Sequence, residues 1–200
     1  KKNAAYIDTA RQMIEVLVPQ ELRVFFVAPL LYSASVHANT SGIFKGFHKN
    51  KDGLGQFGGR GKHALSRIMA DISLLKPVFS NFTSEFEVYQ QDALRLTDIL
   101  SPLDIAYFDP PYNQHPYGSN YFMLNLIANF KAPNLKNLSE VSGIPNDWNR
   151  SNFNKKAKAA DEFFALLSKF PAKYLVISFN SEGFISEAEF LLNLSKSAKS

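Results

Sequence analysis

Clustered glycines constrain the fold of this chain more than any other feature of its sequence. Seven of the ten glycines in the 200 residues lie within residues 39–62, at positions 42, 46, 53, 55, 58, 59 and 61. Glycine destabilises helices and strands because it loses more conformational entropy on ordering than any other residue. We therefore expect residues 39–62, called here the glycine-rich segment, to be a long loop or a small irregular subdomain. A loop of this length inside a compact domain is usually functional.

The same region carries a concentrated positive charge. Residues 45–67 have a net charge of +5, which exceeds the +4 of the whole chain, because Asp52 is their single acid. The six cations are Lys45, Lys49, Lys51, Arg60, Lys62 and Arg67. A local excess of this kind indicates an anionic partner, although a solvated basic loop remains the alternative.

The overall composition excludes several classes of protein. A chain that is 46% hydrophobic and contains 18 Phe and 8 Tyr buries too much apolar surface to be disordered. The longest apolar run, residues 24–32, is too short for a membrane span, which needs about 20 residues. The absence of cysteine excludes disulfides and thiolate chemistry, and the spacing of the four histidines predicts no metal site. We expect a cytoplasmic protein, and a fragment of a longer chain because Lys1 replaces an initiating Met.

Hydrophobic periodicity and breaker residues predict alternating helices and strands. The predicted helices cover residues 6–18, 22–36 (bent near Pro29), 63–75, 121–130, 155–170 and 187–194. The predicted strands cover residues 86–89, 105–108 and 175–179. This alternation is typical of an α/β domain with a mainly parallel sheet.

The segment with the clearest chemical meaning directly follows the predicted strand at 105–108. Asp109, Pro110, Pro111 and Tyr112, called here the Pro-Pro turn, lie where the ends of parallel strands form a ligand crevice. Two prolines fix φ and lack N–H groups, so a carboxylate, free carbonyls and an aromatic ring share one stiff turn. This arrangement suits a flat ligand that bears an amine. A strand-ending turn without chemistry is the alternative.

Five further segments accompany the Pro-Pro turn. They are residues 39–44 (Asn-Thr-Ser-Gly-Ile-Phe), 57–59 (Phe-Gly-Gly), 92–94 (Asp-Ala-Leu), 117–121 (Tyr-Gly-Ser-Asn-Tyr) and 178–183 (Ser-Phe-Asn-Ser-Glu-Gly). Together with the turn, and in this order, they resemble the Dam-like DNA N6-adenine methyltransferases over residues 36–185. The resemblance implies part of a Rossmann-like, S-adenosylmethionine-dependent methyltransferase sheet with a basic, glycine-rich DNA-recognition insertion. We expect a helical lead-in at 1–38, the DNA-recognition segment at 39–80 and the catalytic part at 81–200.

The resemblance assigns roles to individual residues. In the Pro-Pro turn, Asp109 and the Pro110 carbonyl accept the N–H bonds of the target amine, Pro111 stiffens the turn and Tyr112 stacks on the flipped base. The cofactor-binding candidates are Asp92, Ala93, Phe108 and Asp109. The DNA-binding candidates are Asn39, Lys45, Lys49, Arg60, Lys62, Asn120 and Tyr121. Simple structural roles are open for some of them, because Asp92 can cap a helix and Asn120 and Tyr121 can begin one.

The resemblance implies methyl transfer from S-adenosylmethionine to N6 of adenine in double-stranded DNA, with a restriction endonuclease as partner and no membrane. The family's Phe-x-Gly-x-Gly cofactor turn has no counterpart before Asn39, so we expect the C-terminal two-thirds of such an enzyme. Residues 53–58 fit G-x-G-x-x-G but follow no strand. A non-catalytic DNA-binding fragment or degenerate paralogue is therefore one alternative. An N4-cytosine methyltransferase is another, although Asp rather than Ser at position 109 argues against it.

Overall fold

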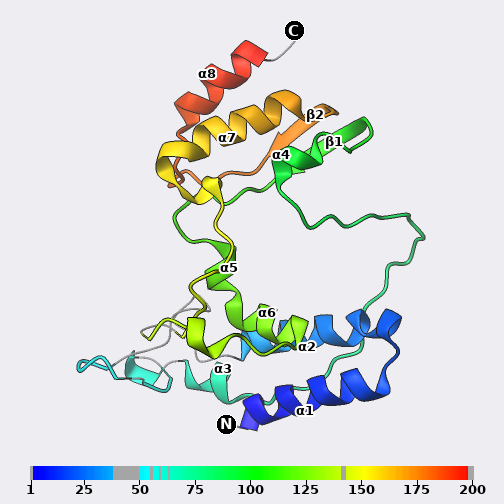
Figure 1. Cartoon of the computed structure of the whole chain (residues 1–200), viewed down its shortest axis with the longest axis vertical. Coiled ribbons are helices and arrows are strands. Elements are labelled where there is room, and N and C mark those ends of the chain that lie inside the picture. Colours follow the sequence, from blue (N-terminus) through cyan, green and yellow to red (C-terminus); the bar gives the residue numbers. More distant parts are fainter. Residues whose placement is uncertain are drawn as a thin grey trace. The chain divides into compact units, whose positions relative to one another are not determined.

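The computed structural model describes residues 2–37, 50–54, 56–58, 60–62, 64–140 and 143–197. The fold is mixed α/β, and its elements form two compact units (Figure 1). Residues 1–83 and 117–148 form one, called the helical unit, and residues 84–116 and 149–200 form the other, called the sheet unit. These boundaries differ from the functional division at residues 38 and 80, which stays a prediction.

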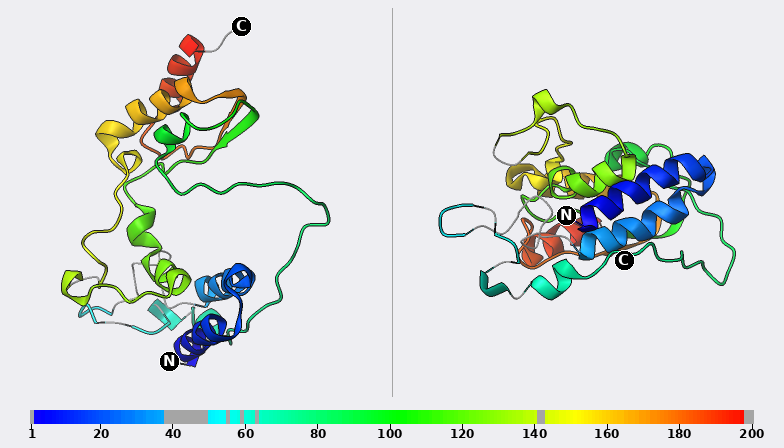
Figure 2. Two further views of the ribbon diagram at one scale, coloured as in Figure 1. Left: turned by 45° about the vertical axis from the view of Figure 1, so that its right-hand side comes forward. Right: turned by 90° about the horizontal axis from the view of Figure 1, so that it is seen from below.

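The helical unit is built on three helices. α1 (Lys2–Leu17) and α2 (Val24–Val36) lie side by side, joined through the 3-10 helix η1 (Gln20–Leu22) (Figure 2). α6 (Phe122–Asn129) also packs against α2. The apolar positions of α1 recur at helical spacing, so one face of the helix is buried. The buried core consists of Ile14, Leu30 and Ile72.

A buried arginine connects these helices. Arg11 in α1 is only 2% exposed, and its Nε donates to the Ile127 carbonyl at 2.7 Å while Nη2 donates to Glu15 at 2.8 Å. Glu15 also forms an ion pair with Arg23, which precedes α2. Pairing compensates the buried charge, and the contact with Ile127 satisfies a carbonyl in the last turn of α6. One charge network therefore joins α1, α2 and α6.

Short elements complete the helical unit. They are η2 (Arg60–Lys62), α3 (Leu65–Met69), α5 (Tyr117–Asn120) and η3 (Leu135–Asn137). In the described part of the glycine-rich segment, η2 is the only regular element, as the sequence predicted. Gly58 shows why glycine is needed there: its φ is +85°, and a Cβ would collide with the Leu65 side chain.

The sheet unit contains the sheet. β1 (Leu103–Phe108) and β2 (Ala172–Ile177) pair in parallel, and the crossover between them includes α7 (Lys156–Lys169). The coarse prediction of an α/β fold with a parallel sheet is therefore confirmed. α8 (Glu187–Ser197) follows β2, and α4 (Ala93–Leu96) precedes β1. The 3-10 helix η4 (Asn152–Asn154) packs against α7.

An aromatic core holds the sheet unit together. Phe163 in α7 is fully buried, and five other rings surround it with centroid separations of 5.8 to 6.2 Å. The five rings belong to Phe108, Phe153, Phe164, Phe179 and Phe190. Most of these contacts are edge-on or tilted, the arrangement that the ring quadrupole favours. The core therefore fixes α7 and α8 against the same face of the sheet.

Two predicted elements are wrong. Residues 86–89 form no strand, because the side chains of Phe86 and Val88 are 83% and 86% exposed and no described strand pairs with them. The helix predicted at 63–75 is only α3, since the backbone turns extended at Ala70. The residues that follow have no regular secondary structure. They are held against the helices because Ile72 packs with Ile14 and Leu30, and the Tyr6 hydroxyl accepts from the Leu74 N–H at 2.9 Å.

Truncation of the central ring should destabilise the sheet unit. We expect Phe163→Ala to lower the free energy of unfolding by about 3–5 kcal/mol, because it leaves a cavity among five aromatic neighbours. Urea unfolding followed by circular dichroism measures the change. Phe86→Ala is the matched control, and its exposed ring predicts a change within about 0.5 kcal/mol. Equal effects of the two variants would contradict the assignment of Phe163 to the core.

Candidate active site

The Pro-Pro turn begins where β1 ends. Asp109 is exposed, whereas Pro110, Pro111 and Tyr112 are half-buried. Within the described part of the chain, no hydrogen bond or ion pair engages the Asp109 carboxylate or the Pro110 carbonyl. The turn therefore presents two kinds of oxygen acceptor that the fold itself does not use.

Backbone hydrogen bonds hold the turn at both ends. The N–H of Ser178, just after β2, donates to the Phe108 carbonyl at 2.8 Å. The N–H of Phe184 donates to the Tyr112 carbonyl at 2.9 Å. The turn thus lies between the ends of two parallel strands, and the chain after β2 braces it.

That bracing chain is itself a tight turn, residues 180–183. The Asn180 side chain accepts from the Glu182 N–H at 2.7 Å, and the Asn180 carbonyl accepts from the Gly183 N–H at 2.8 Å. A Cβ on Gly183 would collide with the Phe179 ring and lie 2.9 Å from the Asn180 carbonyl oxygen. Glycine is therefore required, since the turn folds closely over Phe179. The Phe179 ring in turn meets the Tyr112 ring at 6.2 Å and 68°.

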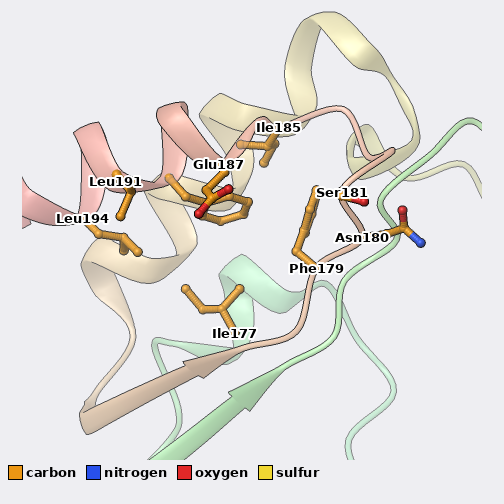
Figure 3. A pocket seen from close by; sticks show the side chains of 9 residues that line it. Ile177, Phe179, Asn180, Ser181, Ile185, Glu187, Leu191 and Leu194 are labelled. Atoms are coloured by element: carbon orange, nitrogen blue, oxygen red, sulfur yellow. The ribbon is translucent and has the colours of Figure 1, made fainter.

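A cavity of about 350 Å³ lies between β2 and α8 (Figure 3). Its walls are mainly apolar, with Glu187 as the charged group, and Phe179 separates it from Tyr112. The lining residues are Ile177, Phe179, Asn180, Ser181, Ile185, Glu187, Phe190, Leu191 and Leu194. The volume is within the range of small-ligand sites. Figure 3 shows the Asn180 side chain directed away from the cavity, so few polar groups converge there.

A capping interaction sets the start of α8 beside this cavity. The backbone N–H and the hydroxyl of Ser186 both donate to the Glu189 carboxylate, at 2.8 and 2.7 Å. These hydrogen bonds favour the ionised carboxylate and lower the pKa of Glu189. The first turn of α8 is thus held to the chain that leaves the sheet.

The cofactor-binding candidates all lie in the sheet unit. Asp92 caps α4, because its Oδ1 accepts from the Leu94 N–H at 3.0 Å, so the helix-cap interpretation is confirmed. Ala93 packs against the same apolar cluster that buries the Phe108 ring. Asp92 and Asp109 are exposed, and the Asp109 carboxylate has no hydrogen-bond partner among the described residues, so both acids can accept further hydrogen bonds. Their contact with a cofactor stays a prediction.

The DNA-binding candidates are only partly described. Asn39, Lys45 and Lys49 lie outside the described residues, as does the side chain of Arg60, while Lys62 is exposed.

Two further DNA-binding candidates lie in and beside α5. Asn120 is 8% exposed, and its Oδ1 has no hydrogen-bond partner among the residues described. Tyr121 is half-exposed, with its ring 5.5 Å from that of Tyr117. Their role in DNA binding stays a prediction.

The described ranges lack two kinds of feature. Those residues contain no group of three or more His, Asp and Glu side chains that could hold a metal ion. None of the helices in the same ranges has the length and apolar character that a membrane crossing requires. The sequence reasoning missed the Phe184 N–H contact with the turn, for which the nearby Gly183 was the available signal.

The chain belongs to the family of D12 class N6 adenine-specific DNA methyltransferases, whose pattern matches residues 1–186. This confirms the Dam-like resemblance. Among relatives, it is 32% identical to the type II methyltransferase M.CviAII of Paramecium bursaria Chlorella virus 1, across 98% of this chain and 55% of that protein. It is 31% identical to the type II methyltransferase M.NlaIII of Neisseria lactamica, across 92% and 52%. The chain thus spans about half the length of these relatives. No solved structure matches it.

The tight turn predicts a sensitive glycine. We expect Gly183→Ala to lower the free energy of unfolding by about 1–3 kcal/mol, because the new methyl group overlaps the Phe179 ring and the Asn180 backbone. Thermal or urea unfolding measures this effect. Ser181→Ala, an exposed substitution in the same turn, is the control and should change stability by less than about 0.5 kcal/mol. If Gly183→Ala were as stable as this control, the turn would accommodate the methyl group with no loss in the free energy of unfolding.

Proposed function

We propose that the protein containing this chain transfers a methyl group from S-adenosylmethionine to N6 of adenine in double-stranded DNA. The observation that carries the proposal is the Pro-Pro turn, with its free acceptors, at the end of a parallel strand in a chain of the D12 class. Because these relatives are type II methyltransferases, we place the protein in a restriction-modification system with an endonuclease partner.

The free acceptors account for the chemistry. The N6 amine of adenine is a poor nucleophile because its lone pair is delocalised into the ring. Asp109 and the Pro110 carbonyl accept its two N–H bonds, so the nitrogen moves toward tetrahedral geometry and directs its lone pair outward. When bound, S-adenosylmethionine would supply an electrophilic methyl group on a positively charged sulfur. The C–S electron pair would stay on sulfur as a neutral thioether, and the methylated nitrogen would release one of its protons to solvent. The protein contributes positioning and electrostatics, which suffice for an in-line transfer of this kind.

The base must leave the duplex to reach these acceptors. Tyr112 is half-buried and braced by Phe179, so its ring is a fixed surface on which a flipped adenine stacks. A stacking ring held by an edge-on neighbour loses little side-chain entropy when the base arrives. This argument favours a planar heterocycle as the substrate group.

We further propose that β1 and β2 are part of a larger Rossmann-like sheet. Their second face carries aliphatic and tyrosine side chains that are 40% to 66% exposed in the described chain: Leu103, Ile105, Tyr107, Tyr174 and Val176. Parallel sheets are normally covered on both faces. Further polypeptide therefore covers this face in the active enzyme, and it completes the cofactor site to which Asp92 and Asp109 contribute acceptors. The half-length coverage of the relatives supports this interpretation.

The glycine-rich segment is proposed as the DNA-recognition insertion. Its cations neutralise phosphates, while glycines let the backbone approach the duplex closely. Lys51 and Lys62, which the structure describes, are exposed and in a position to make such contacts. Polar side chains among these residues would read base edges.

Removal of the carboxylate tests the enzymatic proposal. We expect Asp109→Ala in the complete enzyme to abolish methyl transfer while DNA affinity changes by no more than a few-fold, because phosphate contacts dominate affinity. Radiolabelled methyl transfer and mass spectrometry of the DNA measure activity and identify the methylated base. Asp104→Ala, an exposed acid on the same strand, is the matched control and should retain activity. More than a tenth of wild-type turnover in Asp109→Ala would remove Asp109 from the mechanism, and N4-methylcytosine as the product would favour the cytosine alternative.

The salt dependence of DNA binding tests the glycine-rich segment. We expect replacement of Lys49, Arg60 and Lys62 by Ala to flatten the slope of log K against log salt by about 0.9 per lost phosphate contact, and by about 2 to 3 in total. Fluorescence anisotropy at several salt concentrations, on cognate and random duplexes, measures the slope. A charge-matched control replaces Lys155, Lys156 and Lys158, which lie at the start of α7. If only this control changes the slope, α7 and not the glycine-rich segment contacts DNA.

A further inference from the structure

A side chain from a distant part of the sequence reaches the Pro-Pro turn. The Nδ2 of Asn154 donates to the carbonyl of Asn113, the residue immediately after the turn, at 2.8 Å. The two residues are 41 positions apart. Both are half-buried, so water competes only partly for the hydrogen bond. Asn154 was not among the residues that the sequence pointed to.

The element that carries Asn154 is firmly held. In η4, the Ser151 hydroxyl caps the turn by accepting from the Phe153 N–H at 3.2 Å. The Phe153 ring packs against the central Phe163 at 6.2 Å. The amide of Asn154 therefore extends from a short helical turn fixed by both a cap and the aromatic core, so little ordering is required to present the donor.

The hydrogen bond from Asn154 holds the carboxyl end of the Pro-Pro turn, which the two prolines cannot anchor through N–H groups of their own. Pro110 and Pro111 have no N–H to donate, so the turn is anchored through its carbonyl groups. Phe184 binds the Tyr112 carbonyl from one segment, and Asn154 binds the Asn113 carbonyl from another. Two consecutive peptide planes are thereby held from different elements, which restricts rotation of the backbone that carries the Tyr112 ring.

The side chain of Asn113 extends this anchor. Its Oδ1 accepts from the His115 N–H at 2.9 Å and closes a local turn. Without Asn154, the Asn113 carbonyl would be half-buried and unpaired, and the local turn could reorient to expose that carbonyl to water. Such a change would shift the Tyr112 ring although the residues of the site stay the same.

We propose that Asn154 is a positioning residue for methyl transfer, which holds the carboxyl end of the Pro-Pro turn through the Asn113 carbonyl. The proposal rests on the proposed function. Asn154 touches no reacting atom, and its effect on the reaction passes through the placement of Tyr112 and Asp109. Displacements of about 1 Å at a reacting group can reduce turnover by about 100-fold, so one tether can matter to the rate.

The matched control is on the same element. Asn152 also donates a side-chain hydrogen bond of 2.8 Å, but to Glu162 in α7 and not to the turn. Asn152→Ala removes this hydrogen bond, together with one that Asn152 Oδ1 accepts from Lys155 Nζ at 2.9 Å, and leaves the tether intact. Asn154→Ala removes the tether, and Asn154→Asp keeps the size of the side chain while replacing the donor by an acceptor.

The first measurement is steady-state kinetics of the active enzyme, which gives kcat and KM for DNA. Stopped-flow fluorescence of 2-aminopurine at the target position reports stacking of the flipped base. We expect Asn154→Ala and Asn154→Asp to lower kcat at least tenfold and to weaken stacking of the flipped base. KM for DNA should stay within about twofold, and Asn152→Ala should keep wild-type kcat. A loss shared with Asn152→Ala, or a kcat within twofold of that control in both Asn154 variants, would overturn the proposal.

Hydrogen exchange on the 200-residue chain separates this inference from the proposed function, because it needs no activity. We expect Asn154→Ala to accelerate exchange at least tenfold at the amides of residues 112–115, and Asn152→Ala to leave them unchanged. Unchanged exchange in Asn154→Ala would overturn the tether itself. Absence of methyl transfer by the wild-type enzyme would instead overturn the proposed function, together with any catalytic role for the tether.

Discussion

The packing of rings around Phe163 is the interaction on which the candidate site depends. Phe163 contacts Phe108, the last residue of β1, and Phe179, two residues beyond the end of β2. The Pro-Pro turn begins directly after Phe108, and its Tyr112 ring rests on Phe179. A single buried side chain of α7 therefore sets the positions of both strand ends between which the turn lies. Loosening this core would affect the turn even though no core residue carries reactive groups.

The fold anchors the Pro-Pro turn through hydrogen bonds that do not involve the Asp109 carboxylate or the Pro110 carbonyl. Every anchor found in the described chain is a donor directed at a carbonyl other than that of Pro110: Ser178 to Phe108, Phe184 to Tyr112 and Asn154 to Asn113. Prolines make this arrangement possible because they are rigid without needing donors of their own. Among the described residues, no donor binds the Asp109 carboxylate or the Pro110 carbonyl, as the proposed contact with an amine requires. Electrostatic preorganisation requires acceptor groups that are rigidly held but not already hydrogen-bonded.

The two compact units differ in how they are stabilised. The helical unit combines a small apolar core with the buried network of Arg11, Glu15 and Arg23, whereas the sheet unit relies on aromatic packing. An apolar sheet face is exposed in the sheet unit, and the relatives are about twice as long as this chain. Both facts support the proposal that further polypeptide covers this face of the sheet.

The sequence by itself determined the features that depend on neighbouring residues. Helical patterning predicted α1, α6, α7 and α8, and the length of an apolar run predicted α2. The glycines predicted the irregular backbone of the described part of the glycine-rich segment, because local backbone preferences decide it. Only the tertiary structure decided that residues 72–74 pack as irregular chain against α1 and α2, and that Asn154 reaches Asn113. It also decided that residues 86–89 have no partner strand among the described residues. These outcomes depend on contacts between residues far apart in the chain. Local sequence patterns do not specify such contacts, so only the packing of the folded chain decides them.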